Sequence, residues 1–335
     1  MRTEHFKGAL LSTLIVVSLM APALLVVTIL TAGQVSANPD PYDNIVRGKD
    51  NAYNINNTAD PPWQEYAQGS RPPIIIAENN IGLGKGAIVA AGIANTIRNG
   101  YWNGGIDGVS NPDNHLSDLL DAAFKWMRPG PSDNRDNVLW YEGYGVYANT
   151  TACSNLVDNL RAKGYNIVGN STTPITAGLL APYDILVIPQ LQLGVMGTGG
   201  DPNLLPDADV TTIRNFVEGG KGLLVAEGSD YFVHQYYKVQ DKILNAFNLG
   251  MFFQSDQVVD DVNKYGTRAD QNWLIYVDVN TSHPIGIAYQ ATTGKTKIGL
   301  PSVCSLAPLP TYGVSVTISP GYKEGLPGGT LQYYE

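Results

Sequence analysis

Residues 219–232, GGKGLLVAEGSDYF, place a carboxylate and a serine directly after a short apolar run. In many α/β enzymes the sharp turn between a strand and the next helix holds the catalytic nucleophile. Here Glu227 occupies the tip of that turn, and Ser229 and Asp230 follow it. Two carboxylates that flank a sugar bond can hydrolyse it. Glu227 paired with Asp230, or with Glu142 from an earlier strand, is therefore a candidate for glycoside hydrolysis.

Ser229 is a second candidate nucleophile, because His234 follows it closely and could act as its base. The segment lacks the tight, glycine-flanked serine turn, however, which weakens this interpretation. A structural role is the alternative for Glu227, whose carboxylate could cap a helix or accept hydrogen bonds from loop amides. The pattern favours that structural role and leaves the catalytic one open.

A further group of acidic residues follows the apolar residues 251–253. Asp256, Asp260 and Asp261 could supply oxygen ligands to calcium, which an exported protein meets at millimolar concentration. Their spacing does not match the loop of an EF-hand. The sequence therefore calls for no cofactor, and calcium is the metal that these residues leave open.

Alternating strands and helices, predicted from residue 137 onward, must position these side chains. Apolar strands are expected at 138–142, 184–189 and 223–226, with helices at 152–163 and 209–218 between them. Strands that are apolar on both faces and alternate with helices indicate a parallel sheet covered on both sides. The fold class is thus α/β, with three layers.

Ligands of such sheets bind at the C-terminal ends of the strands. The residues that end these strands or begin the loops after them should share one rim: Glu142, Gln190, Glu227, Ser229 and Tyr231. Before residue 137, the sequence predicts a glycine-rich hairpin over 73–92 and an amphipathic helix over 115–127.

The succession VLWYEG, a helix, YNIV, YDILVIPQ, a helix ending in FVEGGKGLLVAEG, and FFQSDQVVDD resembles the class I glutamine amidotransferase-like superfamily. It is more similar to the extracellular relatives that lack amidotransferase activity. The resemblance spans residues 137–265 and implies a flavodoxin-like domain, which we place at 72–310. The segment GKGAIVAAGI…HLSDLLDAAFKWM resembles the strand-and-helix unit that closes such domains, although here it precedes them.

In amidotransferases a cysteine stands at the position that Glu227 occupies here, with histidine and glutamate partners further on. Cys153 and Cys304 fall elsewhere in the chain. Glutamine hydrolysis through a thiolate needs that sulfur. The resemblance therefore implies a turn that has kept its shape and lost its nucleophile.

The first 37 residues carry Arg2 and Lys7, then a long apolar run that ends in Gln34-Val35-Ser36-Ala37. This pattern is typical of a signal peptide cleaved before Asn38, and the run is also long enough to remain as a membrane anchor. Either alternative places the rest of the chain outside the cytoplasm. Residues 38–71, rich in Asn, Asp and Pro, are expected to form an extended linker.

Other features agree with export. Sequons for glycosylation begin at Asn56, Asn149, Asn170 and Asn280. The two cysteines, Cys153 and Cys304, are expected to form a disulfide in an oxidising environment. The formal net charge of -9 makes nucleic acid an improbable partner, because an acidic chain repels phosphates.

Residues 311–335 alternate as strands around a Gly/Pro turn and resemble the start of the Ig-like β-sandwich repeats of surface proteins. We therefore expect an extracellular, cell-surface protein whose α/β domain serves as a binding or structural module, with envelope components or polysaccharide as partners. The alternatives are a secreted glycan hydrolase that uses Glu227, and an envelope subunit that assembles with itself. An uncleaved leader would add the membrane as a partner.

Overall fold

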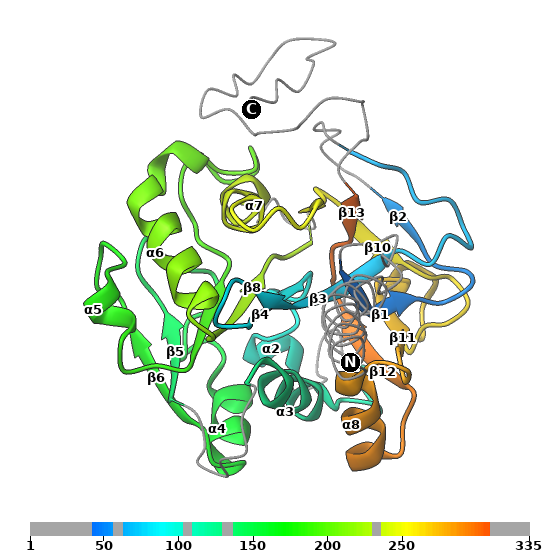
Figure 1. Ribbon diagram of the computed structural model, residues 1–335. Helices are drawn as coiled ribbons and strands as arrows, with labels where there is room; N and C mark the ends of the chain where they lie inside the picture. The colour runs from blue at the N-terminus through cyan, green and yellow to red at the C-terminus, as the bar shows by residue number, and fades with distance from the viewer. Residues whose placement is uncertain (1–41, 56–62, 103–108, 129–136, 230–235, 309–335) are drawn as a thin grey trace, which may run out of the picture. The chain divides into compact units, whose positions relative to one another are not determined.

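The computed structural model describes residues 42–55, 63–102, 109–128, 137–229 and 236–308 (Figure 1). No helix in these ranges is long and apolar enough to cross a membrane. Several predictions fall outside the described residues: the leader at 1–37, Asn56, Asp230, Tyr231, His234 and the sandwich start at 311–335.

A central sheet contains nine of the described strands. In chain order they are β1 (Asp43–Gly48), β3 (Pro73–Ile81), β4 (Gly86–Ala91), β5 (Asn137–Tyr141), β6 (Asn166–Asn170), β7 (Ile185–Pro189), β8 (Gly222–Ala226), β11 (Leu274–Val279) and β12 (Lys297–Pro301). Their order across the sheet is β12-β11-β1-β3-β4-β8-β7-β5-β6. From β4 to β6 neighbouring strands are parallel, whereas from β12 to β4 they are antiparallel. The α/β class is confirmed, but the sheet is mixed rather than parallel throughout.

Two small sheets complete the strands of the described chain. β2 (Tyr53–Ile55) pairs with β10 (Gln257–Val259), and β9 (Met251–Phe253) pairs with β13 (Leu306–Pro308). The two partners in each pair are more than 50 residues apart in the sequence, so neither pair is a local hairpin.

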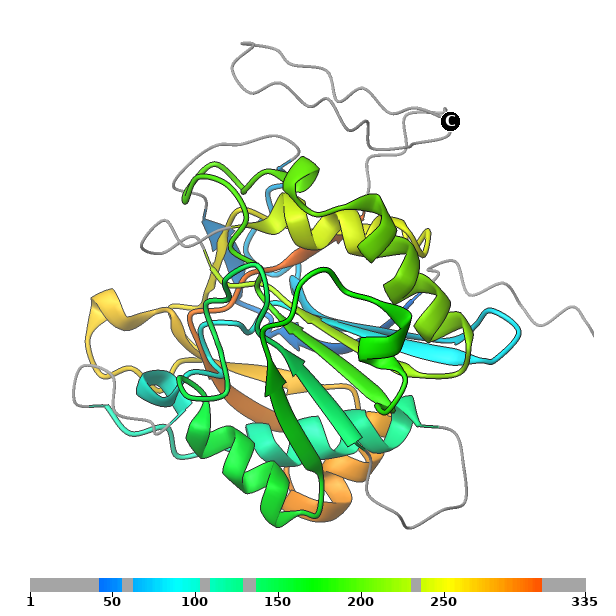
Figure 2. The same ribbon diagram turned by 90° about the vertical axis from the view of Figure 1, so that its left-hand side faces the viewer.

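Helices cover both faces of the central sheet (Figures 1 and 2). The helical segments are α2 (Asn99–Trp102), α3 (Leu116–Met127), α4 (Ser154–Ala162), α5 (Ala177–Leu180), η1 (Pro202–Leu204), α6 (Asp207–Glu218), α7 (Tyr237–Asn245), η2 (Ala269–Gln271) and α8 (Pro284–Thr293). Side chains of α3, α4 and α8 share one hydrophobic cluster, and those of α5, α6 and α7 share another. Three layers result.

Alternation along the strands separates the two clusters. In β8, Leu224 and Ala226 belong to the cluster beneath α3, whereas Leu223 and Val225 belong to the cluster beneath α6. Successive side chains of a strand point to opposite faces of its sheet, so an uninterrupted apolar run fills both cores. The apolar strands predicted from the sequence are explained by this burial on both faces.

The parallel half of the sheet has a known order with an unusual connection. Counted from β5, the strands β6-β5-β7-β8-β4 follow the order 2-1-3-4-5 of flavodoxin-like sheets. The fifth position is taken by β4, which comes first in the chain and leads into α3. The fifth strand of this parallel set is therefore supplied from the N-terminal side of the other four.

Residues 43–48 correct the expected linker. They form β1, which lies between β3 and β11, and Ile45 and Val46 are fully buried. A run of two apolar residues is too short to predict a strand by itself. Its pairing partner β11 lies more than 200 residues away in the sequence, so the strand is stabilised by contacts that no local pattern shows.

Candidate functional site

Glu227 lies at the C-terminal end of β8, near the middle of the central sheet. Its backbone is held on both sides, because its N–H donates to the carbonyl of Ala91 over 3.0 Å and its carbonyl accepts from the N–H of Ala94 over 2.9 Å. The residue is 0% exposed. The turn after β8 therefore points this carboxylate into the protein.

Four N–H groups surround the Glu227 carboxylate. Oε1 accepts from the side chain of Gln190 in a very short contact, from the N–H of Gly228 at 3.0 Å and from the N–H of Tyr236 at 3.4 Å. Oε2 accepts from Gln240 Nε2 at 2.6 Å. Burial raises the pKa of Glu227 to about 7, and these hydrogen bonds oppose the rise. Each carboxylate oxygen is thus committed to neutral donors.

Distant elements orient the two glutamines. Gln190 follows β7 directly and has a left-handed φ of 47°, and its N–H donates to the carbonyl of Ala226 at 3.0 Å. Gln240 lies in α7, and its Oε1 accepts from the N–H of Leu191 at 3.2 Å, which fixes which end of the amide faces Glu227. The carboxylate therefore links β7, β8 and α7. The predicted proximity of Gln190 and Glu227 is confirmed.

Ser229 is also fully buried. Its hydroxyl lies 2.7 Å from the hydroxyl of Ser302 and accepts from Asn95 Nδ2 at 3.1 Å. Neither partner is a base that could activate a serine. A Cβ added at Gly228 would lie 2.6 Å from Asn95 Oδ1, so the residue between Glu227 and Ser229 must be small for the turn to pack.

Glu142 lies at the end of β5 with partners of its own. Its Oε1 accepts from the N–H of Thr150 at 2.7 Å and from the Thr150 hydroxyl at 2.6 Å. These contacts close the loop that follows β5. Glu142 and Glu227 end strands of the same parallel half but bind different groups, so the described contacts do not form the predicted carboxylate pair.

Asp209, for which no functional role was predicted, organises the loops at this edge. It lies in the first turn of α6 and is 1% exposed. Its Oδ2 accepts from the hydroxyl of Tyr144 at 2.7 Å and from the N–H of Ile175 at 2.8 Å. The loop after β5, the segment after β6 and α6 therefore meet at one oxygen. The sequence signal that could have drawn attention to Asp209 is its position as an acid at the start of a predicted helix.

The three residues expected to bind calcium each accept hydrogen bonds from different groups of the protein. Asp256 accepts from Asn54 and Ser305, and Asp260 accepts from the N–H groups of residues 262 and 263. Asp261 is exposed and accepts from Tyr53 and Asn272. The described part of the chain contains no group of three or more acidic, histidine or cysteine side chains arranged to hold a metal ion.

The cysteines correct another expectation. Cys153 and Cys304 are both free and fully buried. Cys153 packs in the cluster beneath α3 and α4, whereas Cys304 packs in the cluster beneath α6 and α7, so the sheet separates them. Burial raises the pKa of the Cys153 thiol to about 12, which makes it a poor nucleophile.

Three of the sequon asparagines are described, and each lies in a polar turn as expected. The side-chain oxygens of Asn149, Asn170 and Asn280 accept from the N–H of Ala152, Thr172 and Ser282, respectively. Such bonds to the backbone two or three residues onward are typical of turns that asparagine initiates. Glycosylation at these positions stays a prediction.

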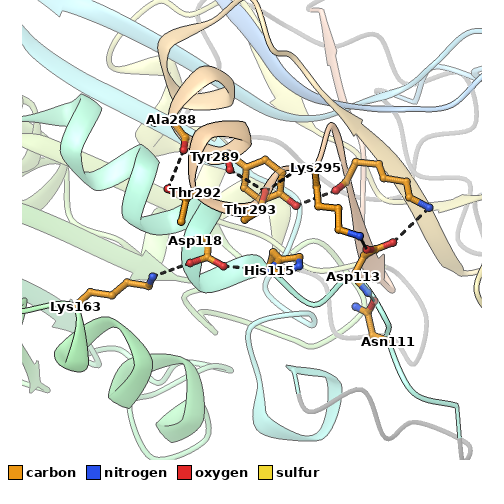
Figure 3. A network of polar contacts seen from close by, with 11 residues as sticks. Asn111, Asp113, His115, Asp118, Lys163, Ala288, Tyr289, Thr292, Thr293 and Lys295 are labelled. Carbon is orange, nitrogen blue, oxygen red and sulfur yellow. Dashed lines mark hydrogen bonds and ion pairs between the residues drawn. The ribbon is translucent and has the colours of Figure 1, made fainter.

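A network of paired charges lies at another surface, where the segment before α3 meets α8 and β12 (Figure 3). Asp113 contacts Lys295 at 3.0 Å and Lys297 at 3.3 Å, and Asp118 contacts Lys163 at 2.7 Å. Burial alone would raise the pKa of Asp113, but the two lysines outweigh it and lower that pKa. Here each partly buried acid has a cation beside it, unlike the acid at the end of β8.

Comparisons with protein-family models, with curated proteins and with solved structures found no match for this chain.

Proposed function

We propose that this protein is an exported, surface-associated protein whose α/β domain is a non-catalytic module that binds or connects envelope components. The observation that carries the proposal is the state of Glu227. A catalytic carboxylate must reach its substrate, whereas this one is fully buried and accepts hydrogen bonds from four N–H groups. The leader and the sequons support export. The resemblance to non-amidotransferase relatives supports a turn whose catalytic role has been lost.

The loops after the parallel strands are the proposed binding face, because ligands of such sheets bind at this edge. Half-buried side chains gather there: the guanidinium of Arg98 lies 4.2 Å from the ring centre of Tyr147, and Glu142 and Thr150 close the same loop. Polar and aromatic groups of this kind suit a polysaccharide, which offers hydroxyl groups and apolar ring faces together.

The test is an assay of the full-length chain, purified in detergent, against a panel of envelope polysaccharides, with binding and sugar release recorded separately. We expect binding without release, weakened by Tyr147→Ala and unchanged by Glu227→Gln. Glu65→Gln, at an exposed position, is the matched control. Circular dichroism must show that each variant is folded. Release of sugar that Glu227→Gln abolishes would establish the hydrolase instead.

Self-association has one observation in its favour. β6 is the last strand of the central sheet, and no described strand pairs with its outer edge. Its Val168 is 37% exposed. An open edge can pair with a strand of another copy. Sedimentation of the purified chain tests this second proposal, and a variant with Lys at position 168 should remain monomeric if the edge mediates assembly.

A further inference from the structure

Three carboxylic acids lie in the core around a single thiol. Glu227 ends β8, Asp241 lies in α7, and Asp256 lies between β9 and β10; their exposed fractions are 0%, 5% and 0%. Burial raises the pKa of Cys304, and the charges of Asp256, Glu227 and Asp241 raise it further. All three acids therefore lie close enough to Cys304 to affect the pKa of its thiol.

Neutral groups provide all of the hydrogen bonds that these acids receive from the described residues. Asp241 accepts from the N–H of Phe253 at 2.8 Å. Asp256 accepts from Asn54 Nδ2 at 2.9 Å, and from both the N–H and the hydroxyl of Ser305. Glu227 accepts from amides only. Hydrogen bonds from neutral donors compensate only part of the cost of burying a negative charge.

The ionisable groups that face the three acids are acidic too. Asp241 faces Glu227, Tyr236 lies near Glu227, and Tyr66 lies near Asp256. Cys304 lies near all three acids. No lysine, arginine or histidine of the described chain makes an ion pair with any of them. This contrasts with Asp113 and Asp118 in Figure 3, which lie beside lysines.

An acid that is buried without a counter-ion is most stable in its neutral, protonated form. We propose that Glu227, Asp241 and Asp256 form a proton-binding centre that stabilises the folded protein in mildly acid surroundings. The centre links α7 and β8 to the small sheets, so its protonation affects the part of the core that positions the candidate site. The proposal is independent of the binding function, because it concerns the stability of the fold.

The direction of the pH dependence follows from the individual groups. Burial raises the pKa of Glu227 to about 7 and that of Asp256 to about 6, and raises the pKa of Asp241 well above its ordinary value. Between the ordinary value and the raised value, the folded chain holds a proton that the unfolded chain has lost. Stability therefore increases as the pH falls from about 7 towards 4.5 for Glu227, and each such group contributes up to about tenfold per pH unit.

One described group acts in the opposite direction in this window. Burial lowers the pKa of His283, so protonation favours the unfolded chain below pH 6.5. Asp113 and Asp184 have lowered pKa values, and their stabilisation is lost only when the pH falls below the ordinary value of 3.8. The three core acids therefore outweigh a single histidine between pH 7 and pH 5.

The experiment is urea unfolding of the full-length chain in detergent at pH 7.5 and pH 5.5. From its raised pKa, Glu227 alone is expected to lower the equilibrium constant for unfolding by about 20-fold at the lower pH, and Asp256 by about 4-fold. Glu227→Gln and Asp256→Asn should each remove their share of this difference. Asp158→Asn, whose side chain is exposed beside Arg161, should leave the difference intact.

Infrared titration provides a readout that does not depend on any variant. The folded wild-type chain should show protonated carboxyl groups near pH 6, where exposed carboxyl groups are ionised. Stability at pH 5.5 that is equal to or lower than that at pH 7.5 would overturn the proposal. So would an infrared spectrum in which all carboxyl groups of the folded chain are ionised at pH 6.

Discussion

Asp209 provides a sharp test of how the loops at the edge of the sheet are held. Its Oδ2 accepts both the Tyr144 hydroxyl and the N–H of Ile175, so one oxygen makes both contacts. Asp207, two residues earlier in the same first turn of α6, has a side chain that is 81% exposed and pairs with Lys242 at 2.6 Å. The two acids share the favourable end of the helix and differ in burial.

The magnitude follows from those contacts. Removing a charged acceptor from two partners costs about 1.5–3 kcal/mol for each hydrogen bond, and the helix end adds about 0.3–1 kcal/mol. We therefore expect Asp209→Ala to lower the free energy of unfolding by about 4 kcal/mol. Asp207→Ala loses the same helix contribution and an exposed ion pair, which together amount to about 1 kcal/mol.

Asp209→Asn separates charge from geometry. Because both bonds end on Oδ2, the amide oxygen of asparagine can take that place and keep both donors satisfied. Its cost should be close to that of Asp207→Ala, about 1 kcal/mol. Urea unfolding at pH 7 measures all three variants against the wild type. Equal losses for Asp209→Ala and Asp207→Ala would refute the assignment of Asp209 as the residue that joins these loops.

Two further predictions concern the core. Gly92→Ala would place a Cβ 2.0 Å from the carbonyl oxygen of Cys304, so it should lower the free energy of unfolding by about 3 kcal/mol or more. Gly100→Ala, whose added Cβ would have nothing within 4 Å, should be neutral. Thermal unfolding compares the two variants. Cys153 and Cys304 should resist a thiol reagent in the folded chain and both react in denaturant without reductant. Failure of both thiols to react in denaturant would indicate a disulfide.

Local sequence patterns were sufficient to predict the elements whose buried face shows as a periodic or continuous run of apolar residues. The amphipathic helix over 116–127 and the hairpin of β3 and β4 were predicted within a residue or two. The apolar strands β7 and β8 were predicted for the same reason, because strands buried on both faces must be apolar throughout. β1 was missed, because only two adjacent residues of its six, Ile45 and Val46, are apolar and its partner β11 comes late in the chain.

The sequence by itself determined the α/β class, the turn after β8 and the carboxylate at its tip. Only the tertiary structure decided what that carboxylate does. Gln190 and Gln240 come from β7 and α7, and their amides reach Glu227 because the parallel strands end at one edge. Burial is likewise a property of all the layers together. From the sequence alone, this glutamate could have faced a substrate, because no local pattern encodes which distant side chains will surround it. In the folded protein it is enclosed.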